Sequence, residues 1–214
     1  MLTALSLNRT FSGSGMLRLP LTMGLALVLS VTIAHAAKTT FGTSEAEQCY
    51  REALSPARAT GTRVCTQAIE KGQLTTRDLA ASYTNRGVIW ARTGEIEKAL
   101  ADHNKALELN PDSIGGLINR ANAHSRDQNY HDALLDYDRA IELSGAAFAP
   151  ALFNRGWVYR AIDDDKTALK DFQAALKLQP DNERYERAAA EAKRQIKEAK
   201  KEARRKKREA HTNG

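Results

Sequence analysis

The sequence predicts an all-α protein, a solenoid of helical hairpins with three clear repeats, a degenerate N-terminal helical pair and a long C-terminal helix. Asn-Arg followed by Gly or Ala stands at 85–87, 119–121 and 154–156, with the third residues 34 and 35 positions apart. Within each copy, apolar and small residues recur at i, i+3, i+4 and i+7, which is the stripe of an amphipathic helix. Only five prolines and 13 glycines occur among 214 residues, which excludes collagen-like and low-complexity chains.

Residues 1–36 have the pattern of a secretory signal peptide. Arg9 and Arg18 precede an apolar run of 16 residues without a charge, and Ala-His-Ala at 34–36 offers a cleavage site after Ala36. Met16 is an alternative start, and an uncleaved membrane anchor is an alternative fate, because such a run nearly spans a bilayer. In both cases the positive flank stays in the cytoplasm. We therefore expect an exported, periplasmic protein.

Residues 37–79 contain a linker and a degenerate helical pair. Cys49 and Cys65, the two cysteines of the chain, fall on the two helices of this pair. An exported protein meets an oxidising compartment, so we expect a Cys49–Cys65 disulfide, with two buried free thiols as the alternative. Thr75 and Asp78 form a capping-box pattern at the start of the next helix.

Three further segments, 80–113, 114–148 and 149–182, each predict two antiparallel helices. Small residues recur where two helix backbones must approach, and ring side chains recur beside them. One hairpin cannot bury its apolar stripe alone, so the copies should stack. The shared positions are Tyr83, Gly87, Trp90, Ala99, Ala106 and Pro111 in the first copy, Leu117, Ala121, His124, Ala133, Tyr137 and Ala140 in the second, and Leu152, Gly156, Tyr159, Ala168, Phe172, Ala175 and Pro180 in the third.

These positions resemble the tetratricopeptide repeat (TPR) family, of an exported bacterial type. The resemblance implies a solenoid in which the first helix of each hairpin lines a concave surface that binds protein segments. The chain departs from the family at Arg86, Arg120 and Arg155, where Leu is common, and at His103 and His124, which stand at ring positions. We interpret both histidines as packing residues.

A second stripe lies on the face of the first helices opposite the small residues, because residues two apart on a helix are about 200° apart. The resemblance places this stripe in the concave groove, as in the asparagine ladder of O-GlcNAc transferases. The alternative for the asparagines is bonding between neighbouring helices, and the alternative for Trp157 is packing. The pattern of the family's carboxylate clamp is absent at Thr84 and Val88, which argues against heat-shock tail binding. The predicted groove residues are Asn85, Arg92, Asn119, Asn122, Arg126, Asn154 and Trp157.

Residues 183–214 predict a long helix that caps the solenoid with its first turns and ends in a basic tail. Ten Lys or Arg and two Glu occupy 193–208, whereas the net charge of the whole chain is +6. This run could hold the protein to an anionic envelope surface such as lipid or lipopolysaccharide; the alternative is a solvated helix. Aromatic residues are missing after Tyr185, which argues against nucleic acid. The candidate residues are Lys200, Lys201, Arg204, Arg205, Lys206, Lys207 and Arg208.

The sequence offers no pattern of catalytic chemistry and implies no cofactor. Its five histidines lack metal-ligand spacing, and it contains no phosphate loop and no nucleophile elbow. The three aspartates at 163–165 could attract a cation, but they are better suited to capping the helix that follows. We therefore expect an exported interaction module, not an enzyme, whose partner the sequence does not name.

Overall fold

The computed structural model describes residues 44–55, 61–71 and 73–212. The chain divides into the units Met1–Phe41 and Gly42–Gly214, and the first of these lies outside the described residues. The predicted signal peptide and its cleavage site fall in that first unit.

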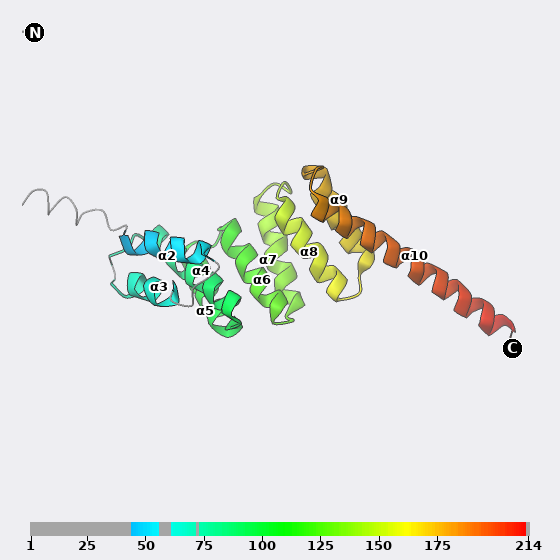
Figure 1. The fold of residues 1–214 in the computed structure, drawn as a ribbon, viewed down its shortest axis with the longest axis horizontal. Helices are drawn as coiled ribbons and strands as arrows, with labels where there is room; N and C mark the ends of the chain where they lie inside the picture. Colours follow the sequence, from blue (N-terminus) through cyan, green and yellow to red (C-terminus); the bar gives the residue numbers. More distant parts are fainter. Residues whose placement is uncertain (1–43, 56–60, 72, 213–214) are drawn as a thin grey trace, which may run out of the picture. The chain divides into compact units, whose positions relative to one another are not determined.

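The described residues are helical throughout and contain no strand, so the predicted all-α solenoid is confirmed for this part of the chain. Successive helices pack as antiparallel neighbours, and each hairpin stacks on the one before it (Figure 1). The helices are α2 Ser44–Leu54, α3 Gly61–Glu70, α4 Thr76–Thr93, α5 Ile96–Leu109, α6 Ile114–Arg126, α7 Tyr130–Leu143, α8 Ala149–Ala161, α9 Asp165–Leu178 and α10 Glu183–Thr212.

Side-chain caps fix where several of these helices begin. The backbone N–H of Asp78 donates to the Thr75 hydroxyl at 3.1 Å, as the capping-box pattern predicts. The N–H of Gly116 donates to the Ser113 hydroxyl at 3.1 Å at the start of α6. Each cap satisfies a backbone donor that the first helical turn leaves without a partner.

The turn inside each repeat uses the left-handed backbone region at one equivalent position. Gly94 has φ of 88° there, and Gln128 and Asp163 both have φ of 61°. Glycine adopts this conformation without steric cost, whereas Gln and Asp are disfavoured. The position is therefore set by the hairpin geometry and not by the residue that fills it.

The two helices of a repeat approach most closely where the small residues face the rings. A Cβ on Gly87 would lie 2.6 Å from His103 Cε1, and a Cβ on Gly156 would lie 2.6 Å from Phe172 Cε1. His103 is buried, as its interpretation as a packing residue requires. A Cβ at either glycine would therefore require the ring opposite it to shift.

The N-terminal hairpin α2–α3 is closed by a covalent bond. Cys49 and Cys65 form the expected disulfide, with Cα atoms 4.7 Å apart, and both side chains are fully buried. Val64 and Ile89 complete a small apolar cluster around it. The hairpin thus joins α4 through few apolar residues, and the disulfide crosslinks its two helices.

The C-terminal end is closed by packing instead. The ring of Tyr185 in α10 stacks on Phe153 with centroids 4.7 Å apart, and Ala188, Ala189 and Ala192 are buried in the same contact. From Lys197 onward α10 is exposed. The first turns of α10 therefore cap the repeats as expected. No helix among the described residues combines the length and apolarity needed to cross a membrane.

Candidate protein-binding groove

Four of the predicted groove residues line one cavity between α4 and α6. Its volume is about 270 Å³. Val88, Ala91 and Ala123 give it an apolar floor, and Ala53 of α2 closes one side. The five polar residues that complete the lining are Arg92, His103, Asn119, Asn122 and Arg126.

Trp157 lies in a second hollow of about 570 Å³, formed where α8 meets α10. The indole is 43% exposed, so it is not a core residue. Arg160 lies over its ring at 5.1 Å, and Arg184 and Arg194 of α10 line the same hollow. An exposed indole beside arginines is the kind of surface that dominates binding energy at protein interfaces.

Asn122 and Asn154 bond to each other, which is the alternative that the sequence left open for these two residues. The Asn154 Nδ2 donates to Asn122 Oδ1 at 3.1 Å, and the Tyr137 hydroxyl donates to the same oxygen at 2.5 Å. Burial raises the pKa of Tyr137, so its hydroxyl stays a donor at neutral pH. This network links α6, α7 and α8.

Asn85 and Asn119 differ from the other two asparagines. Their side chains are half-buried and make no hydrogen bond to any described residue. Asn119 lines the α4–α6 cavity, whereas Asn85 lines neither that cavity nor the Trp157 hollow. A carboxamide offers both a donor and an acceptor. Asn119 is thus the predicted asparagine whose polar atoms are most available to a bound segment.

Arg92 and Arg126 have structural contacts that the sequence did not predict. The Arg92 guanidinium donates to the carbonyl oxygens of Ala53 at 2.9 Å and Ser55 at 2.7 Å, at the end of α2. Arg126 donates to the carbonyl oxygen of Ala91 at 2.6 Å, near the end of α4. Each arginine therefore ties its helix to the preceding first helix. They shape the wall of the cavity as well as lining it.

The arginines of the repeated Asn-Arg pair form a second ladder, on the other side of the first helices. Each makes a two-pronged ion pair with an aspartate 16 residues later: Arg86 with Asp102, Arg120 with Asp136, and Arg155 with Asp171, all with an N–O distance of 2.7 Å. These aspartates are buried. The hydrogen bond to aspartate raises the pKa of each arginine.

Each of these arginines also reaches the second helix of the preceding hairpin. The Nη1 atoms of Arg86, Arg120 and Arg155 donate to Thr66 in α3 at 2.8 Å, Asn104 in α5 at 2.9 Å and Asp138 in α7 at 2.6 Å. One guanidinium thus joins three helices. Arginine at this position, where the family commonly has Leu, therefore holds successive hairpins together.

The remaining histidines and acids that the structure describes are not arranged as a metal site. Within the described residues no group of three His, Cys, Asp or Glu is placed to hold an ion. Asp164 accepts from the Thr167 N–H at 3.1 Å and caps α9, as expected.

Burial, with Arg120 and His124 nearby, lowers the pKa of His103 to about 4, so this ring is neutral at pH 7.

Comparison with known proteins identifies the repeats. Residues 80–113 and 149–182 each match a tetratricopeptide repeat family model. The chain has a TPR-like fold. It superposes on the crystal structure of MamA with a TM-score of 0.60 at 15% identity, covering 71% of this chain and 80% of MamA. Both matched models describe repeats and neither describes an enzyme.

Two other solved TPR structures are described as binding peptides. The first TPR of Spaghetti (RPAP3), bound to the HSP90 peptide SRMEEVD, has a TM-score of 0.52 and 22% identity over 55% of this chain and 92% of that one. YrrB, described as a TPR protein with an unusual peptide-binding site, has a TM-score of 0.53 and 19% identity over 63% of this chain and 64% of that one.

The curated relatives are animal proteins. Human tetratricopeptide repeat protein 36 is 33% identical over 96 residues, which are 44% of this chain and 51% of that protein. Sperm-associated antigen 1 of Mus musculus is 31% identical over 72 residues, 34% of this chain and 8% of that protein. The chain thus spans about half of the first relative and a small part of the second. These relatives give no support to the exported bacterial type predicted from the sequence.

The residues predicted to bind polyanions all lie in α10 and are exposed. Two of the seven are paired within the helix: Arg205 with Glu209 at 3.6 Å and Lys206 with Glu202 at 2.8 Å. The other five, Lys200, Lys201, Arg204, Lys207 and Arg208, make no ion pair with described residues.

Proposed function

We propose that this protein is an interaction module in which the face of α4, α6 and α8 opposite the Arg–Asp ladder binds an extended segment of a partner protein. The observation that carries the proposal is the α4–α6 cavity, which brings Asn119, Arg92 and Arg126 together. Its guanidinium groups meet backbone carbonyls and no described carboxylate, so they keep positive charge for a ligand. The HSP90 peptide bound to the RPAP3 repeat and the peptide-binding site described for YrrB support peptide binding by this fold.

The partner segment would lie along the face of α4, α6 and α8, from the α4–α6 cavity to the Trp157 hollow. Asn119 would bond to its backbone, and Trp157 would take an apolar side chain. Two-site contact of this kind suits an extended chain, because a strand rises about 3.3 Å per residue and so reaches several repeats with few residues.

A photo-crosslinking amino acid at position 119 tests the groove even though the partner is unidentified. We expect it to capture one defined segment, identified by mass spectrometry, that the same group at Leu135 does not capture. Leu135 is the matched control because it is 55% exposed but lies on α7, a second helix. Equal capture of the same segment from Leu135 would place the binding surface elsewhere.

The captured segment then serves as a peptide ligand. Asn119→Ala with Trp157→Ala should weaken its binding about 30-fold, as expected when a hot-spot residue is removed. The circular dichroism spectrum should remain helical, since Trp157 is partly exposed. A folded double variant that binds the peptide with unchanged affinity would refute the groove.

We further propose that the protein is exported and is cleaved after Ala36. The charged, apolar and small-residue order of residues 1–36 supports this, and so does the Cys49–Cys65 disulfide, because such bonds persist in oxidising compartments. N-terminal sequencing of the protein from the periplasmic fraction should begin at Ala37. Recovery with the apolar run intact would indicate a membrane anchor instead.

A further inference from the structure

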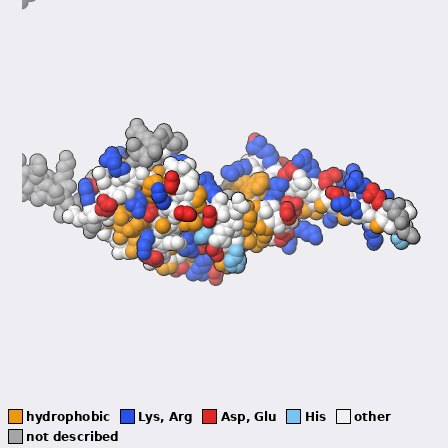
Figure 2. All heavy atoms as spheres, turned by 90° about the horizontal axis from the view of Figure 1, so that it is seen from below, with side chains coloured by type: hydrophobic (Ala, Val, Ile, Leu, Met, Phe, Trp, Pro, Cys, Tyr) orange, Lys and Arg blue, Asp and Glu red, His pale blue; other side chains and the backbone are white. Residues whose placement is uncertain are grey.

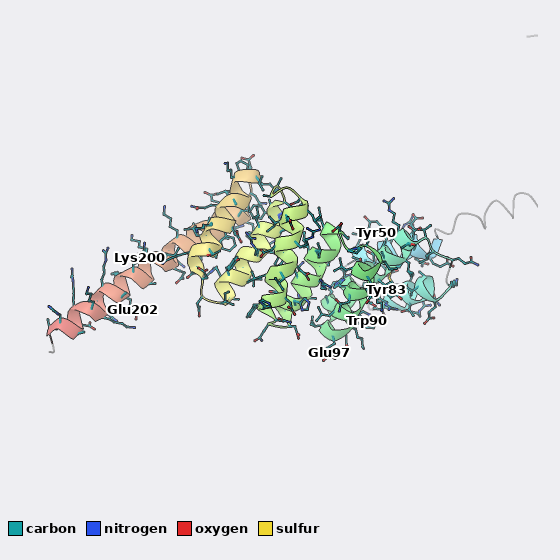
Figure 3. All side chains as sticks on the ribbon, turned by 180° about the vertical axis from the view of Figure 1, so that it is seen from behind. Tyr50, Tyr83, Trp90, Glu97, Lys200 and Glu202 are labelled. Atoms are coloured by element: carbon teal, nitrogen blue, oxygen red, sulfur yellow. A yellow bond between two sulfur atoms is a disulfide. The ribbon has the colours of Figure 1, made fainter. Side chains whose placement is uncertain are left out.

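The tail of α10, residues 193–212, segregates its charges by face. On a helix with 3.6 residues per turn, the glutamates of α10 from Glu191 onward fall within an arc of about 40°. Figure 3 shows Lys200 and Glu202 on opposite sides of the helix. The glutamates are Glu191, Glu198, Glu202 and Glu209.

Three of these glutamates neutralise the cations beside them. Glu191 pairs with Arg194 at 2.6 Å, Glu202 with Lys206 at 2.8 Å and Glu209 with Arg205 at 3.6 Å. The remaining cations fall within an arc of about 120° on the other side of the helix. They make no ion pair with any described residue, and we call them the basic stripe: Lys193, Lys197, Lys200, Lys201, Arg204, Lys207 and Arg208.

An apolar seam runs along one edge of the basic stripe. Ala192, Ile196, Ala199 and Ala203 fall within an arc of about 60° that borders the stripe and not the glutamates. Along this seam Ala192 is buried and Ile196 is half-buried, whereas residues 197–212 are exposed (Figure 2). The tail therefore presents an apolar seam, a cationic face and an acidic face in that order around its axis.

We propose that the basic stripe docks the protein on the surface of an anionic lipid bilayer. A helix lying in the interface of such a membrane needs its cations among the phosphates, its apolar edge toward the acyl chains and its acids toward water. The stripe, the seam and the glutamates meet these three requirements. The site is separate from the groove and does not depend on the groove's function.

The small apolar area of the seam determines how deeply the helix enters the bilayer and how tightly it binds. Alanine and one isoleucine bury little apolar area, so the helix rests on the headgroups and does not insert deeply. Attraction between the stripe and lipid phosphates then dominates the affinity. Such binding weakens steeply with salt, because charges at a membrane surface are screened within about 10 Å at 0.1 M. Nucleic acid also carries phosphates, but the seam favours the bilayer.

Two triple variants that change the net charge equally test the stripe. The stripe variant is Lys197→Gln/Lys200→Gln/Arg204→Gln, and the control is Arg194→Gln/Arg205→Gln/Lys206→Gln, which removes the paired cations. Co-sedimentation with vesicles of phosphatidylserine and phosphatidylcholine should show about a 100-fold loss of affinity for the stripe variant, since each surface cation contributes about fivefold. The control variant should lose much less of its affinity for these vesicles.

Three results would overturn the proposal. Equal losses for the two triple variants would show that net charge alone attracts the protein to vesicles. Equal binding to vesicles of pure phosphatidylcholine would remove the phosphate charge from the mechanism. Tighter, stripe-dependent binding to a 20-base-pair DNA duplex than to the anionic vesicles would assign the stripe to nucleic acid instead.

Discussion

The repeats and the tail use the same cationic side chains in two different environments. Arg86, Arg120 and Arg155 lie between helices with their guanidinium groups on buried carboxylates. The cations of the basic stripe extend from an exposed helix and have no carboxylate partner among the described residues. A charge removed from water stabilises only when its partner is fixed, whereas an exposed charge adds little to stability and stays available for binding. Changes at the two kinds of site should therefore differ widely in their effect on stability.

Removing one arginine of the repeat ladder should have the largest effect. Arg120→Ala leaves the Asp136 carboxylate, which is 6% exposed, without its ion-pair partner. The free energy of unfolding should fall by about 3 kcal/mol, because breaking a buried pair strands a charge. Urea unfolding followed by circular dichroism measures the loss.

The matched control replaces both partners. Arg120→Met with Asp136→Leu should recover most of the stability, since an apolar pair carries no desolvation penalty. A loss below about 1 kcal/mol for Arg120→Ala would mean that the ladder contributes no more than a surface ion pair.

Opening the disulfide should cost nearly as much, but only at the N-terminal end. Cys49 and Cys65 are 16 residues apart. Closing a loop of this length stabilises the folded protein by roughly 3 kcal/mol when the effect is attributed to chain entropy. Cys49→Ala with Cys65→Ala should therefore expose α2 and α3 to proteolysis while α6 to α9 stay resistant. Two free thiols per chain in unfolded, unreduced wild-type protein would show that the bond does not form.

Acid should destabilise the protein through His103. Because its folded pKa of about 4 lies below the ordinary 6.5, folding favours the neutral ring. The stabilisation is complete above pH 6.5 and is lost as the pH falls toward 4, by up to about 3 kcal/mol. Phe172 occupies the equivalent position against Gly156, so His103→Phe is a fitting control. That variant should lose this part of the acid sensitivity, and an unchanged pH profile would contradict the assignment.

Deleting residues 193–214 should have the smallest effect on stability. The tail is exposed apart from Gln195 and Ile196, which are half-buried, and its ion pairs lie within one helix at the surface. We expect the melting temperature to change by less than about 2 °C. A fall of about 10 °C would show that the tail packs on the repeats.

The fold followed from the sequence because the repeat positions are set by close approach. Gly87 and Gly156 must be small where a ring packs on them, so these residues recur at a regular spacing. The Arg–Asp ladder was missed although its signal was present, since aspartate follows each repeat arginine by 16 residues. That constant spacing in the sequence is enough to pair Arg120 with Asp136.

The contacts that the groove residues make with neighbouring helices could not be predicted from the stripe of residues on the first helices alone. The contacts of Arg92 and Arg126 are with the end of the preceding first helix, and they depend on how hairpins stack. Trp157 lies on the predicted stripe and stays exposed, but residues of α10 form the rest of its hollow. Asn154 bonds instead to Asn122 on the preceding first helix, α6. Relations between repeats are a property of the stack, and the spacing within one repeat does not contain them.

Hydrogen–deuterium exchange of the full chain, resolved by peptide mass spectrometry, tests the contrast between repeats and tail most directly. The account predicts that amides of α4 to α9, and of α10 through Ala192, exchange only by global unfolding. Amides beyond Lys197 should exchange at least about 100-fold faster, because no packing holds that part of the helix. Equal protection of the tail and the repeats would contradict the account, since it would show that the tail belongs to the same cooperative unit.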